Sequence, residues 1–162
     1  MNIKVREMTP NDLESIIEIW NEVVESGLAF PQSETFDLSS GEKFFNSQSY
    51  VGVAEEDGKK VVGVYILHPN FVGRCSHISN ASYAVKGSER GKHIGEMLVR
   101  DCLMIAKKLG FSILQLNAVV ASNIPALKLY EKIGFTRLGV ITNGFLRKDG
   151  TYEDIIPHYI TL

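Results

Sequence analysis

The amino-acid sequence predicts one domain of the α/β class, in which helices flank a central sheet over residues 1–162. Three observations support this prediction. The chain has 162 residues, of which 44% are hydrophobic, enough for one substantial core without metals or disulfides. Two long segments carry apolar residues at the helical period, whereas shorter runs are rich in β-branched residues. In the second half, strand and helix patterns alternate as β-α-β-α, and no repeat or linker divides the chain.

The first elements expected are a short strand at 3–7 and a helix that starts near Thr9. Thr9 supplies a hydroxyl N-cap, Pro10 suits the first turn, and Asp12 places an acid three residues after the cap. The residues that follow form one apolar stripe at i, i+3, i+4 and i+7 spacing, and we expect it to lie in the core: Leu13, Ile16, Ile17, Trp20 and Val24.

The pattern loosens between Gly27 and Ser49, where a short helix is expected from about Ser40. This segment has two interpretations. It either lines a substrate pocket or forms a variable surface connection with Phe44 and Phe45 as a half-buried pair. Long connections are only sometimes functional, which favours the second interpretation.

A hairpin and a third strand are expected next. The runs 50–54 and 61–67 are rich in β-branched and aromatic residues, and Asp57-Gly58 between them is a strong turn signal. The run 76–85 forms the third strand and leads through the stretch 87–95 into a second long helix. Its expected apolar face is Ile94, Leu98, Cys102, Ile105 and Leu109, with Gly110 as the C-terminal cap.

The remaining elements are a strand at 113–119, a helix and two strands. The helix begins at 122–125, where serine and asparagine precede proline, and ends at Gly134. The last two strands are expected at 135–141 and 152–160. The turn-rich sequence between them contains Asn143-Gly144 and Asp149-Gly150.

Composition excludes several classes of function. A net charge of −2 gives no general attraction for nucleic acid or an anionic membrane, so a small-molecule or protein substrate is expected. Cys75 and Cys102 form no C-x-x-C pair and lie near no histidine cluster, which predicts free thiols and no metal site. The chain shows no secretory leader or long apolar run, which favours the cytoplasm.

The segment 83–96 predicts a binding site for an anion. It reads as a strand that passes through a small-residue loop into the first turn of a helix. Consecutive backbone N–H groups and the helix dipole suit a diphosphate, and Gly91 and Gly95 allow the backbone to approach it closely. The segment contains neither G-x-G-x-x-G nor G-x-x-x-x-G-K-[ST].

Two motifs resemble the GCN5-related N-acetyltransferase family. Residues 90–95 read Arg-Gly-Lys-His-Ile-Gly, which is similar to the family's pyrophosphate loop: Arg or Gln, two residues, Gly, one residue, then Gly or Ala. His93 stands where the family usually has glycine, which leaves the backbone conformation at this position in question. Residues 123–135 resemble the family's segment of Asn, Ala, Leu-Tyr and Gly-Phe, and the two motifs come in the family's order.

The resemblance implies a fold and a cofactor. It predicts a mixed sheet of about six or seven strands, splayed between the fourth and fifth strands and flanked by about four helices. Acetyl-CoA is the implied cofactor and coenzyme A the product, with the pantetheine arm lying in the splay. The implied cofactor-binding residues are Tyr83, Ala84, Val85, Arg90, Gly91, Lys92, His93, Ile94, Gly95, Glu96, Asn123 and Tyr130.

The resemblance also implies direct attack of a neutral amine on the thioester, with Tyr130 protonating the leaving thiolate. Spacing alone would make Tyr130 a core tyrosine, but the family position favours the catalytic interpretation. Many relatives use a glutamate of the fourth or fifth strand as the base, and 76–85 and 113–120 contain none. The base is therefore either water or His77, although a structural role for His77 is the stronger alternative.

Asn80 and Asn117 are the expected substrate-binding residues, on the two strands that border the acceptor site. Their amides would bind a substrate carboxylate or amide, or else satisfy backbone groups at a bulge. Runs 77–83 and 116–120 also resemble the branch that acetylates proline-like amino acids and small amines. A small amine is thus the expected substrate, in a pocket closed by Gly27–Ser49 and Gly144–Asp149. Two alternative functions remain open, a protein or peptide substrate and a non-catalytic acyl-CoA-binding module. A homodimer is also compatible with the sequence.

Overall fold

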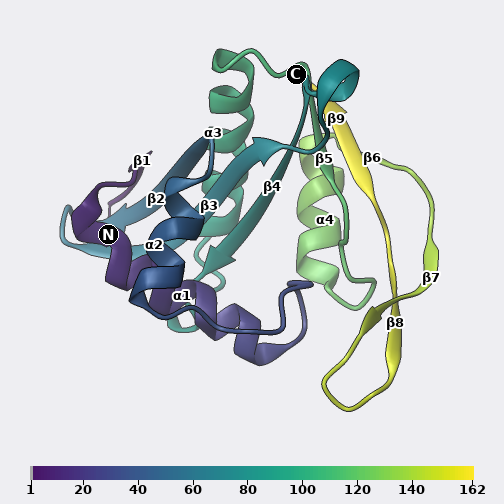
Figure 1. Ribbon diagram of the computed structural model, residues 1–162, viewed down its shortest axis with the longest axis horizontal. Helices are drawn as coiled ribbons and strands as arrows, with labels where there is room; N and C mark the ends of the chain where they lie inside the picture. Colours follow the sequence, from purple (N-terminus) through teal and green to yellow (C-terminus); the bar gives the residue numbers. More distant parts are fainter. Residues whose placement is uncertain (1) are drawn as a thin grey trace.

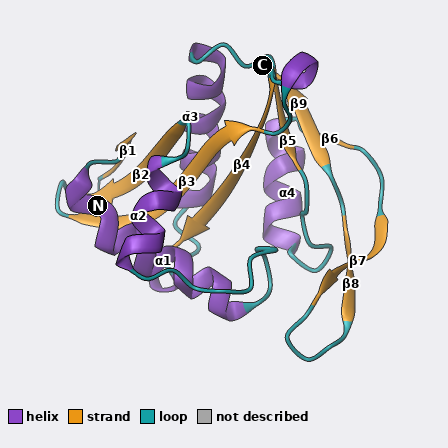
Figure 2. Ribbon diagram, in the orientation of Figure 1, coloured by secondary structure: helices purple, strands orange, loops and turns teal. Residues whose placement is uncertain are grey.

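The computed structural model describes residues 2–162 and confirms an α/β fold with a seven-stranded mixed sheet (Figure 1). The strand order is β1-β2-β3-β4-β5-β9-β6. In chain order these strands are β1 (Ile3–Glu7), β2 (Tyr50–Glu56), β3 (Lys60–Pro69), β4 (Ile78–Val85), β5 (Ile113–Leu116), β6 (Thr136–Arg137) and β9 (His158–Thr161). The described α-helices are α1 (Leu13–Ser26), α2 (Leu38–Asn46), α3 (Ile94–Lys108) and α4 (Ile124–Ile133), as Figure 2 shows.

The first four strands form an antiparallel meander. Strands β2 and β3 join at Asp57-Gly58, where both residues have positive φ, +51° and +69°, as a primed hairpin turn requires. The predicted hairpin is therefore confirmed. Strands β4 and β5 run parallel but pair only from Ile78↔Ile113 to Asn80↔Gln115. Beyond this point they diverge, which confirms the predicted splay.

Two apolar cores lie on opposite faces of the sheet. Helices α1 and α2 cover one face, where Trp20 and Phe45 pack with Val53 and Val64. Helices α3 and α4 cover the other face, where Leu98 and Tyr130 belong to a second cluster. The predicted stripe of α1 is confirmed as core. The alternation of side chains along a strand explains how β3 supplies both cores.

The stripe predicted for α3 is wrong at its C-terminal end. Leu109 is 49% exposed, because it caps the helix where the chain turns into Gly110, whose φ is +93°. The predicted strand at 113–119 is likewise too long. It ends at Leu116, where the chain leaves β4.

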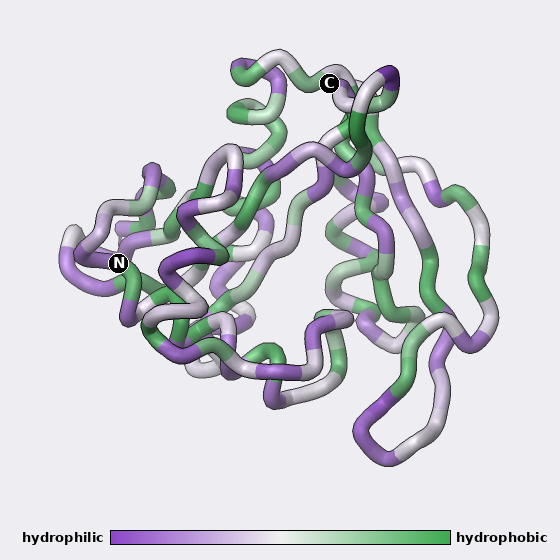
Figure 3. Tube along the Cα trace, in the orientation of Figure 1, coloured by the Kyte–Doolittle hydropathy of each residue, from purple (hydrophilic) through white to green (hydrophobic). Residues whose placement is uncertain are grey.

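The C-terminal part holds more strands than predicted. Besides β6 and β9 it forms a separate two-stranded arm, β7 (Ile141–Leu146) and β8 (Tyr152–Ile155), which Figure 1 shows projecting beside the sheet. Asn143-Gly144, predicted as a turn, lies inside β7 at a register shift, and Asn143 has φ +56°. Figure 3 shows apolar and polar stretches alternating along this arm. At its tip Lys148 donates a hydrogen bond to the Glu25 carbonyl of α1.

Candidate active site

The divergence of β4 and β5 opens two adjoining cavities. The larger has a volume of about 640 Å³ and the smaller about 180 Å³. Ala29, Tyr83 and Asn123 line both, so the two cavities meet at these residues. The structure thus joins the segment after α1, the end of β4 and the start of α4 at one place.

The larger cavity gathers most of the predicted cofactor-binding residues. Its wall contains the end of β4 and the loop that precedes α3: Tyr83, Ala84, Val85, Arg90, Gly91, His93, Ile94, Gly95 and Glu96. Lys92 is outside this lining and pairs with Glu89 instead. His93 has φ +60° and ψ +15°, the left-handed conformation open to glycine, at a cost of about 1 kcal/mol. The question raised by histidine at this position is therefore answered: the backbone keeps a conformation that glycine would adopt.

Glu89 is a component of the loop that sequence reasoning missed. It lines the larger cavity, is only 6% exposed, and accepts hydrogen bonds from Lys60 at 2.6 Å and from Lys92. These ammonium groups, Lys60 first, hold the pKa of Glu89 at about 2, so its carboxylate is ionised and balanced at neutral pH. Lys60 comes from β3, 29 residues away, and no local pattern predicts that contact.

The loop is also tied to α1. The Gly87 amide donates to Glu22 Oε2 at 2.9 Å, and Lys86 pairs with Glu18 at 3.0 Å. Glu18 and Glu22 of α1 thus hold the first residues of the loop, Lys86 and Gly87. They make no hydrogen bond to the backbone amides of residues 90–96.

The smaller cavity contains both predicted substrate residues. Asn80 Nδ2 donates to the Gln115 carbonyl at 2.8 Å, at the last paired position of β4 and β5. Asn80 therefore satisfies a backbone group at the point where the strands separate, one of the two roles considered for it. Asn117 exchanges two amide hydrogen bonds with Asn70, at 2.7 and 3.2 Å.

Part of the segment between α1 and α2 closes the smaller cavity. Ala29, Phe30 and Pro31 line it. Farther along, Phe45 is buried against Trp20 at a centroid distance of 5.6 Å. The predicted segment Gly27–Ser49 therefore has two parts. Its first residues line the smaller cavity, and its helix α2 packs in the core.

Tyr130 lines the smaller cavity and is 9% exposed. Helix α4 places it there: Asn123 caps the helix by accepting from the Ala126 amide at 3.4 Å, and Gly134 ends it with φ +105°. The Tyr130 ring packs between Phe135 and His158, at centroid distances of 5.3 and 5.7 Å. Burial raises the pKa of the Tyr130 phenol, so the hydroxyl keeps its proton at physiological pH.

The structure does not bring His77 to these cavities. His77 is exposed, precedes β4, and lies six residues before Tyr83, which corresponds to about 20 Å of extended chain. The histidine beside Tyr130 is instead His158, which is 1% exposed and contacts the Ile156 carbonyl through Nδ1 at 2.6 Å. Burial lowers its pKa, and Nε2 has no hydrogen-bond partner among residues 2–162. Only the tertiary fold reveals this neighbour.

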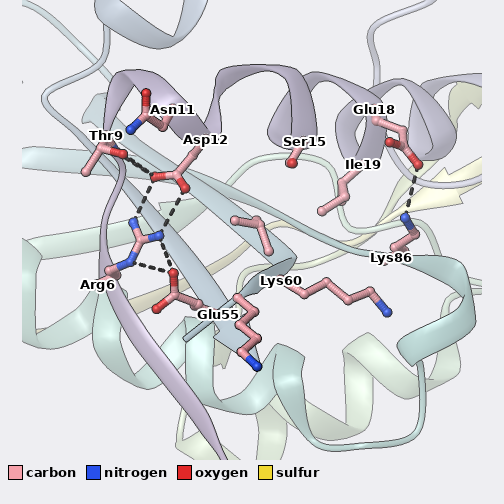
Figure 4. Close-up of a pocket in the computed structure, with 12 residues that line it drawn as sticks. Arg6, Thr9, Asn11, Asp12, Ser15, Glu18, Ile19, Glu55, Lys60 and Lys86 are labelled. Carbon is pink, nitrogen blue, oxygen red and sulfur yellow. Dashed lines mark hydrogen bonds and ion pairs between the residues drawn. The ribbon is translucent and has the colours of Figure 1, made fainter. Parts of the chain in front are cut away.

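A third cavity, of about 420 Å³, shares no lining residue with the other two (Figure 4). Arg6 dominates its chemistry. The guanidinium binds Asp12 at 2.8 and 3.0 Å and Glu55 at 2.6 Å, joining β1, the start of α1 and β2. We assign this network to stability, because its charges already satisfy one another.

Comparison with known proteins identifies the family to which this geometry belongs. The acetyltransferase (GNAT) family model matches residues 13–135, which include the loop before α3 and the Tyr130 helix. The chain belongs to the GNAT family. Among the described residues, no group of three or more His, Cys, Asp or Glu suits a metal, and no helix is long and apolar enough to cross a bilayer.

Relatives of this GNAT chain include proteins of different length. It is 39% identical over 95 residues to N-acetyltransferase aca1 of Schizosaccharomyces pombe, covering 58% of this chain and 46% of that protein. It is 29% identical over 148 residues to the putative phosphinothricin acetyltransferase YwnH of Bacillus subtilis, covering 89% and 90%. A GCN5-related N-acetyltransferase structure from Kribbella flavida superposes with a TM-score of 0.91 at 26% identity, covering 99% and 98%. The chain thus spans about half of the first relative and nearly all of the other two.

Proposed function

We propose that this GNAT protein transfers an acetyl group from acetyl-CoA to the primary or secondary amine of a small molecule, such as an amino acid or an analogue. The observation that carries the proposal is the meeting of two cavities of unequal size beside Tyr130. The larger cavity suits the coenzyme and the smaller suits a compact amine. The similarity to a putative phosphinothricin acetyltransferase supports the same substrate class.

The free edge of β4 fits the coenzyme. One edge of β4 pairs with β3 as far as Val85, whereas pairing with β5 stops at Asn80. The main-chain groups of Tyr83 and Val85 point away from β3 and are therefore available to the amides of pantetheine, whereas those of Ala84 face β3. Loop residues 90–96 and the N-terminus of α3 would hold the diphosphate through backbone N–H groups.

The acyl transfer needs an acid near the thioester sulfur, and Tyr130 supplies a proton-bearing hydroxyl in the smaller cavity. The neutral amine attacks the thioester carbonyl, and backbone N–H donors stabilise the oxyanion. The C–S bond then breaks, the thiolate takes the Tyr130 proton, and the amine gives its surplus proton to water, which returns a proton to the Tyr130 phenolate. Water is the acceptor because the described lining of this cavity holds no carboxylate, imidazole or amino group.

The test is thiol release from acetyl-CoA across amino acids, proline analogues, polyamines and peptides. Tyr130→Phe should lower kcat by about 100-fold while acetyl-CoA still binds, because only the proton donor is lost. Tyr152→Phe, an exposed tyrosine of the arm, is the matched control and should keep full activity. His77→Ala should also keep it.

Other outcomes would favour the alternatives. Tight acetyl-CoA binding without turnover of any amine would favour a non-catalytic acyl-CoA-binding module. Turnover of peptides alone would favour a protein or peptide acetyltransferase. Equal kcat for Tyr130→Phe and the wild-type protein would remove Tyr130 from the mechanism.

A further inference from the structure

The imidazole of His158 lies against the ring of Tyr130, the residue to which we assign the proton donor. Strand β9 carries His158 between β5 and β6, opposite Leu116 and Arg137 in the strand register (Figure 1). The centroids of the His158 and Tyr130 rings are 5.7 Å apart, and the ring planes are inclined at 57°. Leu116 lines the smaller cavity, whereas His158 does not. His158 is therefore next to the candidate site without being part of its surface.

One hydrogen bond fixes the orientation of the His158 ring. Its Nδ1 atom lies 2.6 Å from the Ile156 carbonyl oxygen. A carbonyl only accepts hydrogen bonds, so Nδ1 carries the hydrogen and Nε2 is the bare nitrogen of the neutral ring. The Ile156 amide in turn donates to the Val119 carbonyl at 2.8 Å, and Val119 lines the smaller cavity. The ring is thus tied to the main chain of the cavity wall.

The second ring nitrogen argues that His158 does more than fill space. Nε2 is buried and has no hydrogen-bond partner among residues 2–162. An unpaired buried acceptor costs free energy, which an apolar side chain at this position would avoid. What histidine adds over an apolar side chain is the Nδ1–H donor, and with it a ring held in one orientation against Tyr130.

The contact with His158 also locates the Tyr130 ring relative to the sheet. The other aromatic neighbour of Tyr130 is Phe135, at a centroid distance of 5.3 Å. The Phe135 amide donates to the Tyr130 carbonyl at 2.9 Å, so Phe135 belongs to the same helix end and would move with it. His158 instead belongs to the sheet, whose diverging strands form the cavities.

We propose that His158 is a positioning residue for Tyr130, which holds the tyrosine ring so that its hydroxyl stays directed at the leaving sulfur. This inference rests on the proposed function, because it needs Tyr130 to act as the acid. A displacement of a reacting group by about 1 Å can lower a rate by about 100-fold. His158 therefore influences kcat although it touches neither the coenzyme nor the amine.

Two variants separate the ring from its hydrogen bond. His158→Asn removes the ring but keeps an N–H donor, and kcat should fall about tenfold because Tyr130 gains room to turn. The affinity for acetyl-CoA and the KM of the amine should stay within about twofold, since His158 lines neither cavity. His158→Phe keeps a ring but loses the bond to Ile156, so its kcat should lie between those of His158→Asn and the wild-type protein.

A double-mutant cycle with Tyr130→Phe distinguishes positioning from a general loss of structure. Tyr130→Phe keeps the ring but has no hydroxyl to direct. In that background His158→Asn and His158→Phe should each change kcat by less than about twofold, because a positioning residue acts only through the group that it places. A merely structural role would lower kcat by the same factor in both backgrounds.

Val53→Ala is the matched control. Val53 is fully buried in the core on the face of the sheet that α1 and α2 cover, away from Tyr130. Its truncation should lower the free energy of unfolding in urea. It should leave kcat unchanged when the rate is counted per molecule that binds acetyl-CoA.

The outcomes separate this inference from the proposed function. An unchanged kcat in His158→Asn, or equal losses in the two backgrounds, would overturn the inference and leave the transferase proposal intact. Should His158→Asn not fold, the same comparison with His158→Phe decides the question. No turnover of any amine by the wild-type protein, or equal kcat for Tyr130→Phe and the wild-type protein, would overturn the role of Tyr130 and this inference with it.

Discussion

A carboxylate lies in the wall of the cavity that we assign to a diphosphate, and two lysines make this arrangement compatible with anion binding. Glu89 would repel the phosphates if it stood alone. Lys60 and Lys92 balance its charge, and Lys60 reaches it from β3, so the sheet and the loop share one ion-pair network. The affinity for the coenzyme should therefore depend on residues that do not touch it.

Lys60→Met should weaken coenzyme A binding by about threefold or more, because the Glu89 charge is then less well balanced near the phosphates. Lys59→Met, on the neighbouring exposed lysine, is the matched control and should leave the affinity unchanged. In the Lys60→Met background, Glu89→Gln should recover part of the loss by removing the unbalanced charge. Calorimetric titration of the wild-type protein and these three variants tests the prediction, and unchanged binding by Lys60→Met would refute the network's role.

The pH dependence of catalysis should follow the acceptor amine. The described lining of the smaller cavity offers no base, so the amine must arrive neutral, and log kcat/KM should rise with a slope near one until the amine's own pKa. Tyr130 should add no falling limb below about pH 10, because its pKa is raised and the proton-bearing form persists. Initial rates from pH 6 to 10, with two amines of different pKa, test this. A rising limb that stays at one pH for both amines would reveal an enzyme base.

Helix α4 couples the two cavities. Asn123 at its N-terminus lines both, and Tyr130 lies seven residues later, about 10.5 Å along the axis. A change in the cap should therefore affect both the proposed coenzyme cavity and the position of the Tyr130 hydroxyl.

Asn123→Ala should lower the free energy of unfolding by about 1 kcal/mol through loss of the N-cap, and should also weaken acetyl-CoA binding. Asn123→Asp separates the two effects, since aspartate caps a helix as well as asparagine but donates no hydrogen bond. Its stability should match the wild-type protein, whereas its coenzyme affinity should not. Urea unfolding and acetyl-CoA titration provide the two readouts, and full affinity in Asn123→Ala would exclude a direct contact.

Elements with local signals could be predicted from the sequence, and elements set by tertiary contacts could not. The start of α1 and the Asp57-Gly58 hairpin each carry their own signal, a cap or a turn pair. The pair Asn143-Gly144 carries the same kind of signal yet forms a bulge in β7, because β8 pairs on both sides of it. The strand predicted at 113–119 ends at Leu116; Val119 is buried in the loop that follows, and Val120 forms an isolated bridge with Ile155.

The candidate site divides in the same way. Its loop and Tyr130 belong to continuous motifs, so their positions could be predicted. His158 and Lys60 come from strands that are distant in the sequence, so no local residue spacing predicts their contacts with Tyr130 and Glu89. The imidazole of His77 and its place in a predicted strand make it a candidate base in the sequence, and the structure puts it outside the cavities.

Ion pairs join the N-terminal segment of the chain to strand β2, and β3 to the loop before α3. Arg6 binds Asp12, which is buried, and Glu55, and so links β1, the first helical turn and β2 (Figure 4). The Arg6 hydrogen bonds lower the pKa of Asp12, and those of Lys60 and Lys92 lower that of Glu89 to about 2. A carboxylate whose pKa is lowered by folding contributes its full stabilisation at pH values above its pKa in the unfolded chain. It loses this contribution as the pH falls through its pKa in the folded protein.

Stability should therefore begin to fall below about pH 6.5, where unfolding lets His158 gain a proton, and should fall further as these carboxylates gain protons towards pH 2. Arg6→Met should cost about 2 kcal/mol at pH 7, because Asp12 is left charged and buried. At pH 2 the cost should shrink, since the Asp12 charge is lost. Urea unfolding followed by fluorescence and circular dichroism tests this, and an equal cost at both pH values would contradict it. Coincident transitions are also expected if residues 1–162 form one domain.

Strand β4 lies in the middle of the sheet, yet beyond Asn80 one of its sides has no neighbouring strand. In the unliganded protein its gap-facing amides should exchange with deuterium like those of a sheet margin, and a pantetheine arm should slow them. Exposed margins ordinarily recruit other chains and promote aggregation. Here Ala29–Pro31 and residues of α4 line the cavity beside this margin, so we expect a slender ligand to reach it more readily than a strand of another protein. The fold thus places unpaired backbone groups of β4 inside a cavity.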